Sequence, residues 1–261
     1  MKTALITGGQ QGIGLGIATT LAGGGYSVAI AAEADPENPT VRDALTTLGD
    51  KACYYRHDVR DIAAIPTLLD RLEDDLGPLT TFVSNAGVGA PIRGDMLDLS
   101  PENFDFVMSV NLKGAFFLAQ EAAKRMLGHD EGYRSIIFIT SVSADMVSIE
   151  RAEYCISKAA AAMAAKLFAA RLASGNIGVF DIRPGIIETG MTAGVKDKYT
   201  ARIEAGLVPA ARWGTPQDVA AAVLPLVRGD FAFANADGIR MAESYTLVKQ
   251  VSVHIDYHVE I

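Results

Sequence analysis

The sequence predicts an α/β fold in which a parallel β-sheet is covered by helices on both faces. Short apolar runs alternate with longer segments of helical periodicity along most of the 261 residues. The apolar runs show little polar alternation, which is typical of strands buried on both faces of a parallel sheet. No internal repeat or long linker divides the chain, so we expect a single domain over residues 1–261.

Six β-strands are predicted from apolar runs bounded by turn residues. The first run lies near the start of the chain, and the second follows the break Gly23-Gly24-Gly25. In chain order the predicted strands are 3–7, 26–31, 52–56, 81–84, 135–140 and 178–182.

Helical periodicity fills most of the segments between these runs. The predicted helices are 13–22, 63–76, 103–127, 154–173 and 216–227. The segment 35–40, rich in proline and acidic residues, predicts a loop. Two helical stretches, 115–127 and 159–173, are apolar over much of their surface, so each must be buried either within the chain or between subunits.

The composition argues against several classes of protein. Twenty-three basic and 31 acidic residues give a net charge of −8, which disfavours a phosphate-neutralising surface for nucleic acid. No apolar stretch reaches the roughly 18 residues that a membrane span needs, and the glycine-rich start differs from a signal peptide. The two cysteines, Cys53 and Cys155, fit a reducing compartment. We therefore expect a cytoplasmic protein that binds neither nucleic acid nor a membrane.

A glycine-rich turn joins the first predicted strand to the first predicted helix. Its sequence runs Thr7-Gly8-Gly9-Gln10-Gln11-Gly12-Ile13-Gly14. Glycines there allow a tight turn and let backbone N–H groups approach a diphosphate at the positive end of the helix. The spacing differs from the G-x-G-x-x-G fingerprint, and an ordinary β–α turn is the alternative.

Two further segments stand at the ends of predicted strands. Ser84-Asn85-Ala86-Gly87 closes the strand 81–84, and its small residues leave room for a ligand in the crevice there. Asp58 and Val59 follow the strand 52–56, where an Asp more often caps a helix than contacts a ligand. A plain turn would use the same residue types, so neither segment is specific alone.

Three polar residues stand at positions suited to acid–base chemistry. Ser141 follows the strand 135–140, and Tyr154 and Lys158 lie four residues apart at a helix start, hence on one helix face. An ammonium beside a phenol stabilises the phenolate, and such a phenol can give a proton to a carbonyl oxygen or take one from an alcohol. Ser141 can hold the same oxygen by a hydrogen bond. A surface pair on an amphipathic helix is the alternative for Tyr154 and Lys158.

Together and in this order, the motifs resemble the short-chain dehydrogenase/reductase family, in its short single-domain branch. The matching features run from residue 3 to about 230 and are 7–14, Asp58, 84–87, Asn111-Leu112-Lys113-Gly114, Ser141, Tyr154 with Lys158, and Arg183-Pro184-Gly185-Ile186-Ile187-Glu188-Thr189. The resemblance implies a doubly wound, Rossmann-type sheet and an NAD(P)-dependent oxidoreductase that interconverts a secondary alcohol and a ketone. Similar members include 3-oxoacyl-carrier-protein reductases and sugar or polyol dehydrogenases. The alternative is a catalytically silent dinucleotide-binding or regulatory protein on the same fold.

The resemblance also implies roles for individual residues. Tyr154 is the general acid/base, and Lys158 promotes its ionisation and holds the nicotinamide ribose. Ser141 orients the substrate oxygen, while Asn111 holds a water that relays protons through Lys158. The implied cofactor residues are Gly8, Gln10, Gln11, Gly12, Ile13, Gly14, Ala32, Glu33, Asp58, Val59, Asn85, Ala86, Gly87, Tyr154, Lys158, Pro184, Gly185, Ile187 and Thr189. Helices 115–127 and 159–173 commonly form the subunit contact in the family, which implies a homodimer or homotetramer, and no metal is expected.

The end of the second strand bears on the choice between NAD and NADP because it faces the 2′ position of the adenosine. Ala32 occupies the place where family members that favour NAD usually carry Asp, and Glu33 the place where many NADP users carry Arg. Gln11 stands where a basic residue often helps to hold the 2′-phosphate. A carboxylate near a phosphate is repulsive, and cations are absent from these positions. We therefore expect NAD rather than NADP, with Glu33 or Asp35 reaching the ribose.

The C-terminal segment departs from the family pattern. Residues 231–240 resemble the approach to the closing Asp-Gly-Gly turn, but Ala242-Glu243-Ser244 stands in place of that turn. An extension of about 245–261 follows, and within it 251–261 alternates apolar and polar residues like a half-buried strand. Its polar face carries His254, Asp256, His258 and Glu260. We expect this face to be solvated or to meet another subunit rather than to bind a metal.

The segment 190–213 is expected to fold over a small-molecule alcohol or ketone substrate as a flexible lid. It carries apolar side chains together with Lys196, Lys198, Arg202 and Arg212. This mixture suits a sugar acid, a steroid or an acyl thioester, so the sequence does not choose among them.

Overall fold

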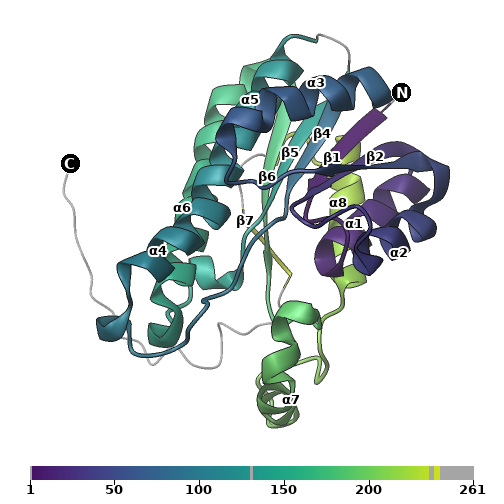
Figure 1. Ribbon diagram of the computed structural model, residues 1–261. Helices are drawn as coiled ribbons and strands as arrows, with labels where there is room; N and C mark the ends of the chain where they lie inside the picture. Colours follow the sequence, from purple (N-terminus) through teal and green to yellow (C-terminus); the bar gives the residue numbers. More distant parts are fainter. Residues whose placement is uncertain (1, 130–131, 235–237, 242–261) are drawn as a thin grey trace.

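Parallel strands form one seven-stranded sheet in the computed structural model, which describes residues 2–129, 132–234 and 238–241 (Figure 1). The strand order is β3-β2-β1-β4-β5-β6-β7. The strands are β1 Lys2–Thr7, β2 Tyr26–Ala32, β3 Ala52–Arg56, β4 Leu79–Ser84, β5 Arg134–Ile139, β6 Ile177–Pro184 and β7 Gly238–Met241. The chain moves outward from β1 to β3 and then returns to the other side of β1, so the order reverses between β1 and β4. Sheets of this kind bind ligands at such a reversal, beyond the carboxyl ends of the strands.

Helices cover both faces of the sheet because successive side chains of a strand point to opposite sides. The helices α1 (Gly12–Gly23), α2 (Pro39–Leu48) and α8 (Pro216–Arg228) pack on the face to which Ala4 and Ile6 point. The helices α3 (Ile65–Leu76), α5 (Ala115–Leu127) and α6 (Ala152–Leu172) pack on the face to which Leu5 points. The helix α4 (Pro101–Met108) precedes α5, and α7 (Lys196–Glu204) lies beyond the carboxyl ends of the strands (Figure 1). The predicted doubly wound fold is confirmed.

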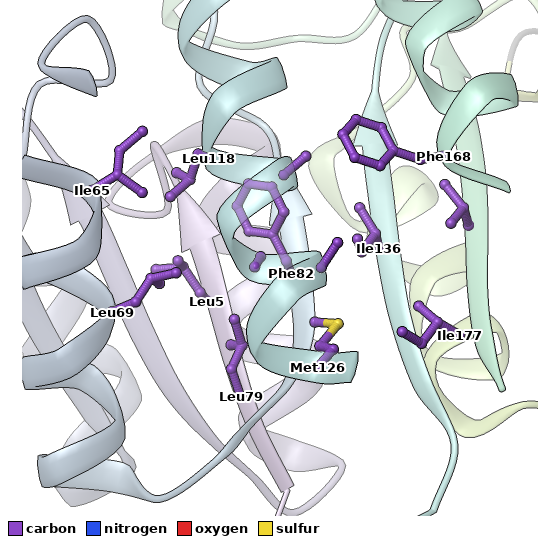
Figure 2. Close-up of a cluster of buried hydrophobic side chains, with 14 of the residues drawn as sticks. Leu5, Ile65, Leu69, Leu79, Phe82, Leu118, Met126, Ile136, Phe168 and Ile177 are labelled. Carbon is purple, nitrogen blue, oxygen red and sulfur yellow. The ribbon is translucent and has the colours of Figure 1, made fainter. Parts of the chain in front are cut away.

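The core under α3, α5 and α6 holds the carboxyl ends of the central strands in place. Figure 2 shows side chains of the sheet, among them Phe82 and Ile136, meeting Leu118 of α5 and Phe168 of α6. Phe82 and Ile136 are fully buried. Phe168 also stacks on Phe138, with ring centroids 5.9 Å apart. Aromatic rings packed in this way fix α6, the helix that carries Tyr154 and Lys158, against the sheet.

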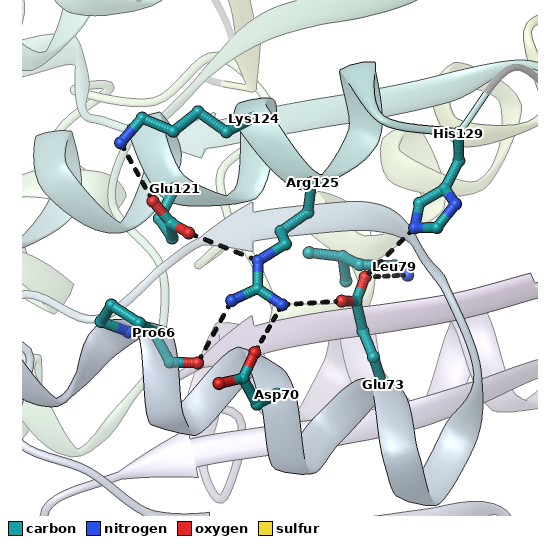
Figure 3. Close-up of polar contacts among 8 residues, drawn as sticks. All are labelled: Pro66, Asp70, Glu73, Leu79, Glu121, Lys124, Arg125 and His129. Atoms are coloured by element: carbon teal, nitrogen blue, oxygen red, sulfur yellow. Dashed lines mark hydrogen bonds and ion pairs between the residues drawn. The ribbon is translucent and has the colours of Figure 1, made fainter.

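A partly buried arginine connects α3 to α5 over this core. The Arg125 guanidinium lies 2.7 Å from Asp70, 3.1 Å from Glu73 and 3.3 Å from Glu121 (Figure 3). Its side chain is 23% exposed, so water screens these ion pairs less than it screens pairs on an open surface. The cluster therefore fixes the position of α3 relative to α5.

Most of the predicted elements are confirmed, but one helix and one loop differ. Each of the six predicted strands agrees with a strand of the sheet to within two residues at either end. The helix predicted over 103–127 is divided, because a π-helical turn at Ser109–Gly114 separates α4 from α5. The loop predicted at 35–40 is wrong at its end, since α2 begins at Pro39 with Asn38 Oδ1 accepting the Thr40 N–H at 3.0 Å.

The predicted lid 190–213 is more regular than expected. It contains a 3₁₀ turn at Gly190–Val195 followed by α7. At the C-terminal end, β7 overlaps the end of the segment 231–240 and extends one residue beyond it. The predicted strand 251–261 and its four polar side chains lie outside the described residues.

Both cysteines, Cys53 and Cys155, are free thiols. Of the helices in the described part of the chain, none has the length and apolar character of a membrane span.

Candidate active site

A cavity of about 1580 Å³ runs along the carboxyl ends of the strands. Glu33 and Asp58 lie at one end of it, and the turn before α7 lies at the other. All nineteen of the predicted cofactor residues line this cavity, as does Ser141. Asn111 is the exception among the predicted site residues, because it is buried behind the wall of the cavity. The sequence motifs therefore meet in one cleft.

The glycine-rich turn between β1 and α1 forms a narrow cradle. Gly8 and Gly12 have φ angles of +65° and +53°, which favour glycine. A Cβ on Gly14 would lie 2.3 Å from the Gly8 carbonyl oxygen and 2.6 Å from Asn85 Nδ2. Gln10 Oε1 is buried and has no hydrogen-bond partner among the described residues. A close backbone approach at a helix N-terminus fits the diphosphate of a dinucleotide.

The ends of β1 and β4 are held together by side chains of Thr7 and Asn85. The Thr7 hydroxyl accepts the N–H groups of Asn85 and Ala86, each at 3.0 Å. Asn85 Nδ2 donates to the Thr7 carbonyl oxygen at 2.9 Å. These bonds fix the carboxyl ends of β1 and β4 relative to each other, at the place where the strand order reverses. Thr7 was not among the predicted site residues, since a hydroxyl at a strand end gives no signal of its partners.

Carboxylates surround the cations at the end of the cleft that carries Glu33 and Asp58, where the sequence predicts the adenosine. Arg60 donates to Asp58 through Nε at 2.9 Å and Nη2 at 2.6 Å, and the same guanidinium lies 3.8 Å from Glu33. The hydrogen bonds from Arg60 lower the pKa of the Asp58 carboxyl. Arg56 lies 3.2 Å from Asp35. The sequence positions considered for a 2′-phosphate contain no cation, yet the fold brings Arg60 to this part of the cleft already paired.

Tyr154 and Lys158 face the cleft from the first turns of α6. Lys158 Nζ lies 5.7 Å from the centre of the Tyr154 ring and donates to the Ile139 carbonyl oxygen at 3.1 Å. Lys158 is 6% exposed, so its ammonium is held in a fixed place at the end of β5. Ser141, just beyond β5, accepts the Ser143 N–H at 3.1 Å through its hydroxyl and keeps its own proton to donate.

Asn111 connects two segments that lie behind this site, the loop after β4 and the first turns of α6. It lies in the π-helical turn, and its Oδ1 accepts the Val88 N–H at 2.8 Å. Its Nδ2 donates to the Val88 carbonyl and to the Ser157 hydroxyl, both at 3.0 Å. A Cβ on Gly87 would lie 3.3 Å from Asn111 Oδ1 and 3.4 Å from Lys158 Nζ. Asn111 thus links the loop after β4 to the turn of α6 that carries Lys158.

Hydrogen bonds fix the position of the segment after β6 where it enters the cleft. The Glu188 N–H donates to the Gly214 carbonyl at 2.8 Å, and the Gly214 N–H donates to the Ile186 carbonyl at 3.0 Å. The Thr189 N–H donates to the Thr192 hydroxyl at 3.0 Å. Pro184, Gly185, Ile187 and Thr189 therefore hold a fixed course along the cavity wall.

No three His, Cys, Asp or Glu side chains within residues 2–129, 132–234 and 238–241 are placed to hold a metal ion.

Known proteins resemble this chain over nearly its whole length. 2-Dehydro-3-deoxy-D-gluconate 5-dehydrogenase of Escherichia coli K12 is 32% identical and is matched over 90% of this chain and 91% of that protein. A family model described as enoyl-(acyl carrier protein) reductase matches residues 8–241. The chain belongs to the short-chain dehydrogenase/reductase family.

Other members of the short-chain dehydrogenase/reductase family agree with this assignment. The 3-oxoacyl-[acyl-carrier-protein] reductase MabA of Mycobacterium bovis is 34% identical over 89% of this chain and 87% of its own length. The crystal structure of a 3-oxoacyl-[acyl-carrier protein] reductase from Brucella melitensis in complex with NAD has a TM-score of 0.90 and 44% identity, and covers 95% of this chain and 98% of that one. The chain is therefore an NAD(P)-dependent oxidoreductase acting on CH–OH groups, as the sequence motifs implied.

Proposed function

We propose that Tyr154 is the general acid/base for the interconversion of a secondary alcohol and a ketone. The observation that carries this role is the placement of the Lys158 ammonium, 5.7 Å from the Tyr154 ring centre, in a cleft that also exposes Ser141. An ammonium at that place stabilises a phenolate, which can take the alcohol proton, and the phenol can return it to a carbonyl oxygen. A bound nicotinamide supplies or accepts the hydride.

Ser141 and Asn111 support this step in different ways. Ser141 donates a hydrogen bond to the substrate oxygen and so orients the carbon that reacts. Asn111 fixes the position of the α6 turn that carries Lys158 relative to the loop after β4. Its Oδ1 has a second lone pair, which can accept a hydrogen bond from a water that relays protons. The direct test is the turnover of Tyr154→Phe.

We also propose that the cofactor is NAD. The exposed Glu33 carboxylate and its neighbour Asp58 share one arginine, so the group Glu33–Asp58–Arg60 carries a net charge of −1. A 2′-phosphate placed there would be repelled by Glu33 and would find Arg60 already bound to Asp58. A ribose hydroxyl, by contrast, can donate to the Glu33 carboxylate. The Brucella relative that was crystallised with NAD supports the same choice.

Parallel titrations with NADH and NADPH test this preference. We expect NADH to bind at least tenfold more tightly, and we expect Glu33→Gln to reduce the ratio roughly fivefold, because it removes the repulsion of a phosphate. The measurement is the fluorescence of bound reduced nicotinamide. Glu37→Gln is the matched control, since Glu37 stands in the same loop and pairs with Arg42 outside the cleft. Tighter binding of NADPH by the wild-type protein would refute the preference.

We propose a homodimer or homotetramer that forms through α5 and α6. Ile156, Met163 and Leu167 lie on one face of α6 and are 47%, 55% and 59% exposed. An apolar stripe of this kind on an otherwise amphipathic surface is typical of a subunit contact. The two free thiols also suit a reducing compartment, and we propose the cytoplasm.

The subunit contact predicts a change in mass on substitution. Leu167→Glu places a charge at the C-terminal end of the stripe, on its most exposed side chain, so the oligomer is expected to dissociate to a smaller species. Analytical ultracentrifugation measures the mass. Thr47→Glu, exposed on α2 on the opposite face of the sheet, is the control. A Leu167→Glu protein with the mass of the wild type would place the contact elsewhere.

A further inference from the structure

The substrate end of the cleft is rich in cations. Four basic side chains line it, together with the acidic side chain of Glu150: they are Arg93, Arg151, Lys198 and Arg202. None of these four forms an ion pair within the described part of the chain, whereas Arg212 in the same cleft is paired with Asp218 at 2.7 Å. The chain as a whole has a net charge of −8. The cationic lining is therefore a local feature of this end of the cleft.

Arg151 is the cation of this group that lies beside the reacting centre. Its guanidinium carbon is 5.3 Å from the centre of the Tyr154 ring. Its Nε donates to the Ser148 hydroxyl at 3.4 Å, in the loop that follows Ser141. Arg151 is partly buried, and its two terminal nitrogens have no hydrogen-bond partner within residues 2–129, 132–234 and 238–241. The acid–base step uses Tyr154, Ser141 and Lys158, so it leaves Arg151 without a role.

A guanidinium in this position is suited to a carboxylate. The planar fork of arginine binds both oxygens of a carboxylate at once, and a hydrogen bond between two charged groups is stronger than one between neutral groups. A substrate whose C–O group contacts the Tyr154 hydroxyl places the next few carbon atoms close to that ring. Arg151 lies against the same ring, so it can reach a group attached a few bonds from the reacting carbon.

We propose that Arg151 binds a carboxylate of the substrate, and that the substrate is a hydroxy acid or oxo acid. This inference rests on the proposed role of Tyr154, because that residue fixes where the reacting carbon lies. Lys198 and Arg202 of α7, which also line the cleft, draw the anion into it. A neutral thioester a few bonds from the reacting carbon would leave the Arg151 fork without an anion, so a free acid fits this site better.

Binding of matched acids and esters tests the inference. The probes are acetoacetate with methyl acetoacetate, and levulinate with methyl levulinate, so that the same ketone is offered with and without a charge at two distances. Each is titrated into the complex of the protein with NAD⁺, which cannot reduce a ketone, and the dissociation constant is measured by isothermal titration calorimetry. We expect at least one acid to bind the wild-type complex 10- to 100-fold more tightly than its ester.

Variants then assign that preference to Arg151. Arg151→Met should abolish it while leaving the affinity for the ester unchanged, and Arg151→Lys should restore part of it, because the charge returns without the fork. Arg171→Met is the control, as an exposed arginine in the last turn of α6, outside the cleft. An acid preference that survives in Arg151→Met would overturn the inference, and so would the absence of any preference in the wild-type complex.

Turnover of the same probes with NADH separates the two proposals. If the acid binds through Arg151 and Tyr154→Phe reduces it as fast as the wild type does, the inference stands and the role of Tyr154 falls. If the wild-type protein reduces acid and ester equally well and Tyr154→Phe reduces neither, the role of Tyr154 stands and the inference falls.

Discussion

Replacement of Tyr154 by Phe is expected to lower kcat by roughly 10²- to 10⁴-fold, the usual contribution of a positioned general acid or base. The ring packs between parts of the chain that the substitution leaves in place, with Lys158 and Arg151 at 5.7 Å and 5.3 Å from its centre. Only the hydroxyl is lost, so the site loses a proton carrier and keeps its shape. Turnover with a fixed alcohol or ketone, measured by nicotinamide absorbance, gives the result.

The affinity for NADH separates a chemical role of Tyr154 from a structural one. We expect it to change little in Tyr154→Phe, because the glycine-rich turn and Asn85 lie at a different part of the cleft. Tyr133→Phe is the matched control, since the Tyr133 hydroxyl is buried away from the cleft and has no hydrogen-bond partner among the described residues. Wild-type turnover in Tyr154→Phe would exclude Tyr154 as the acid/base.

Local patterns in the sequence were enough to place most of this site. The strands of a parallel sheet are buried on both sides, so their apolar runs stand out, and their carboxyl ends lie along one edge. A residue just beyond any such run therefore lies near the others, which is why Gly8, Asp58, Asn85 and Ser141 meet in one cleft. The spacing of Tyr154 and Lys158 works for a similar reason, since four residues bring two side chains to one helix face.

Contacts between distant parts of the chain could not be predicted in this way. Asn111 was assigned to the cleft, but its partners Val88 and Ser157 come from different elements, and its side chain is buried behind the wall. Arg60 reaches the end of the cleft with Glu33 through its bond to Asp58 rather than through a position in the glycine-rich turn. Such placements depend on how the helices pack against the sheet, and no local pattern in a single sequence predicts that packing. The helix α2 was missed because the Asn38–Pro39 start resembles a turn as much as a helix cap.

A buried charge network in β6 is another feature that the apolar pattern of the strands did not reveal. Arg183 Nε donates to Asp181 at 2.7 Å, and its Nη1 donates to Asp145 at 2.5 Å. Arg240 of β7 also binds Asp145, at 2.8 Å, and the Thr140 hydroxyl donates to Asp181. The Asp145 pKa is lowered: burial raises it, and Arg183 and Arg240 lower it more. The network thus ties β6 and β7 to the loop that follows Ser141.

Arg183→Met is expected to lower the free energy of unfolding by about 3–5 kcal/mol, because it leaves a charge buried without a partner. Asp181 is 1% exposed, and the Thr140 hydroxyl alone cannot replace a guanidinium. A Cβ on Gly238 would lie 2.6 Å from Arg183 Nε, so the arginine also fills the space over β7 that glycine leaves open. Urea unfolding followed by circular dichroism measures the change.

The double variant Asp181→Asn with Arg183→Met isolates the electrostatic part of this loss. It removes the buried charge as well as its partner, so it should recover much of the stability that the single variant loses, as replacement of a whole buried pair often does. Arg42→Met serves as the control, because the exposed pair of Arg42 with Glu37, at 3.7 Å, should change stability by less than about 1 kcal/mol. If Arg183→Met were as mild as Arg42→Met, Asp181 would have to be neutral or solvated in the folded protein. If the double variant were no more stable than the single one, lost packing against Gly238 would account for the effect instead of charge.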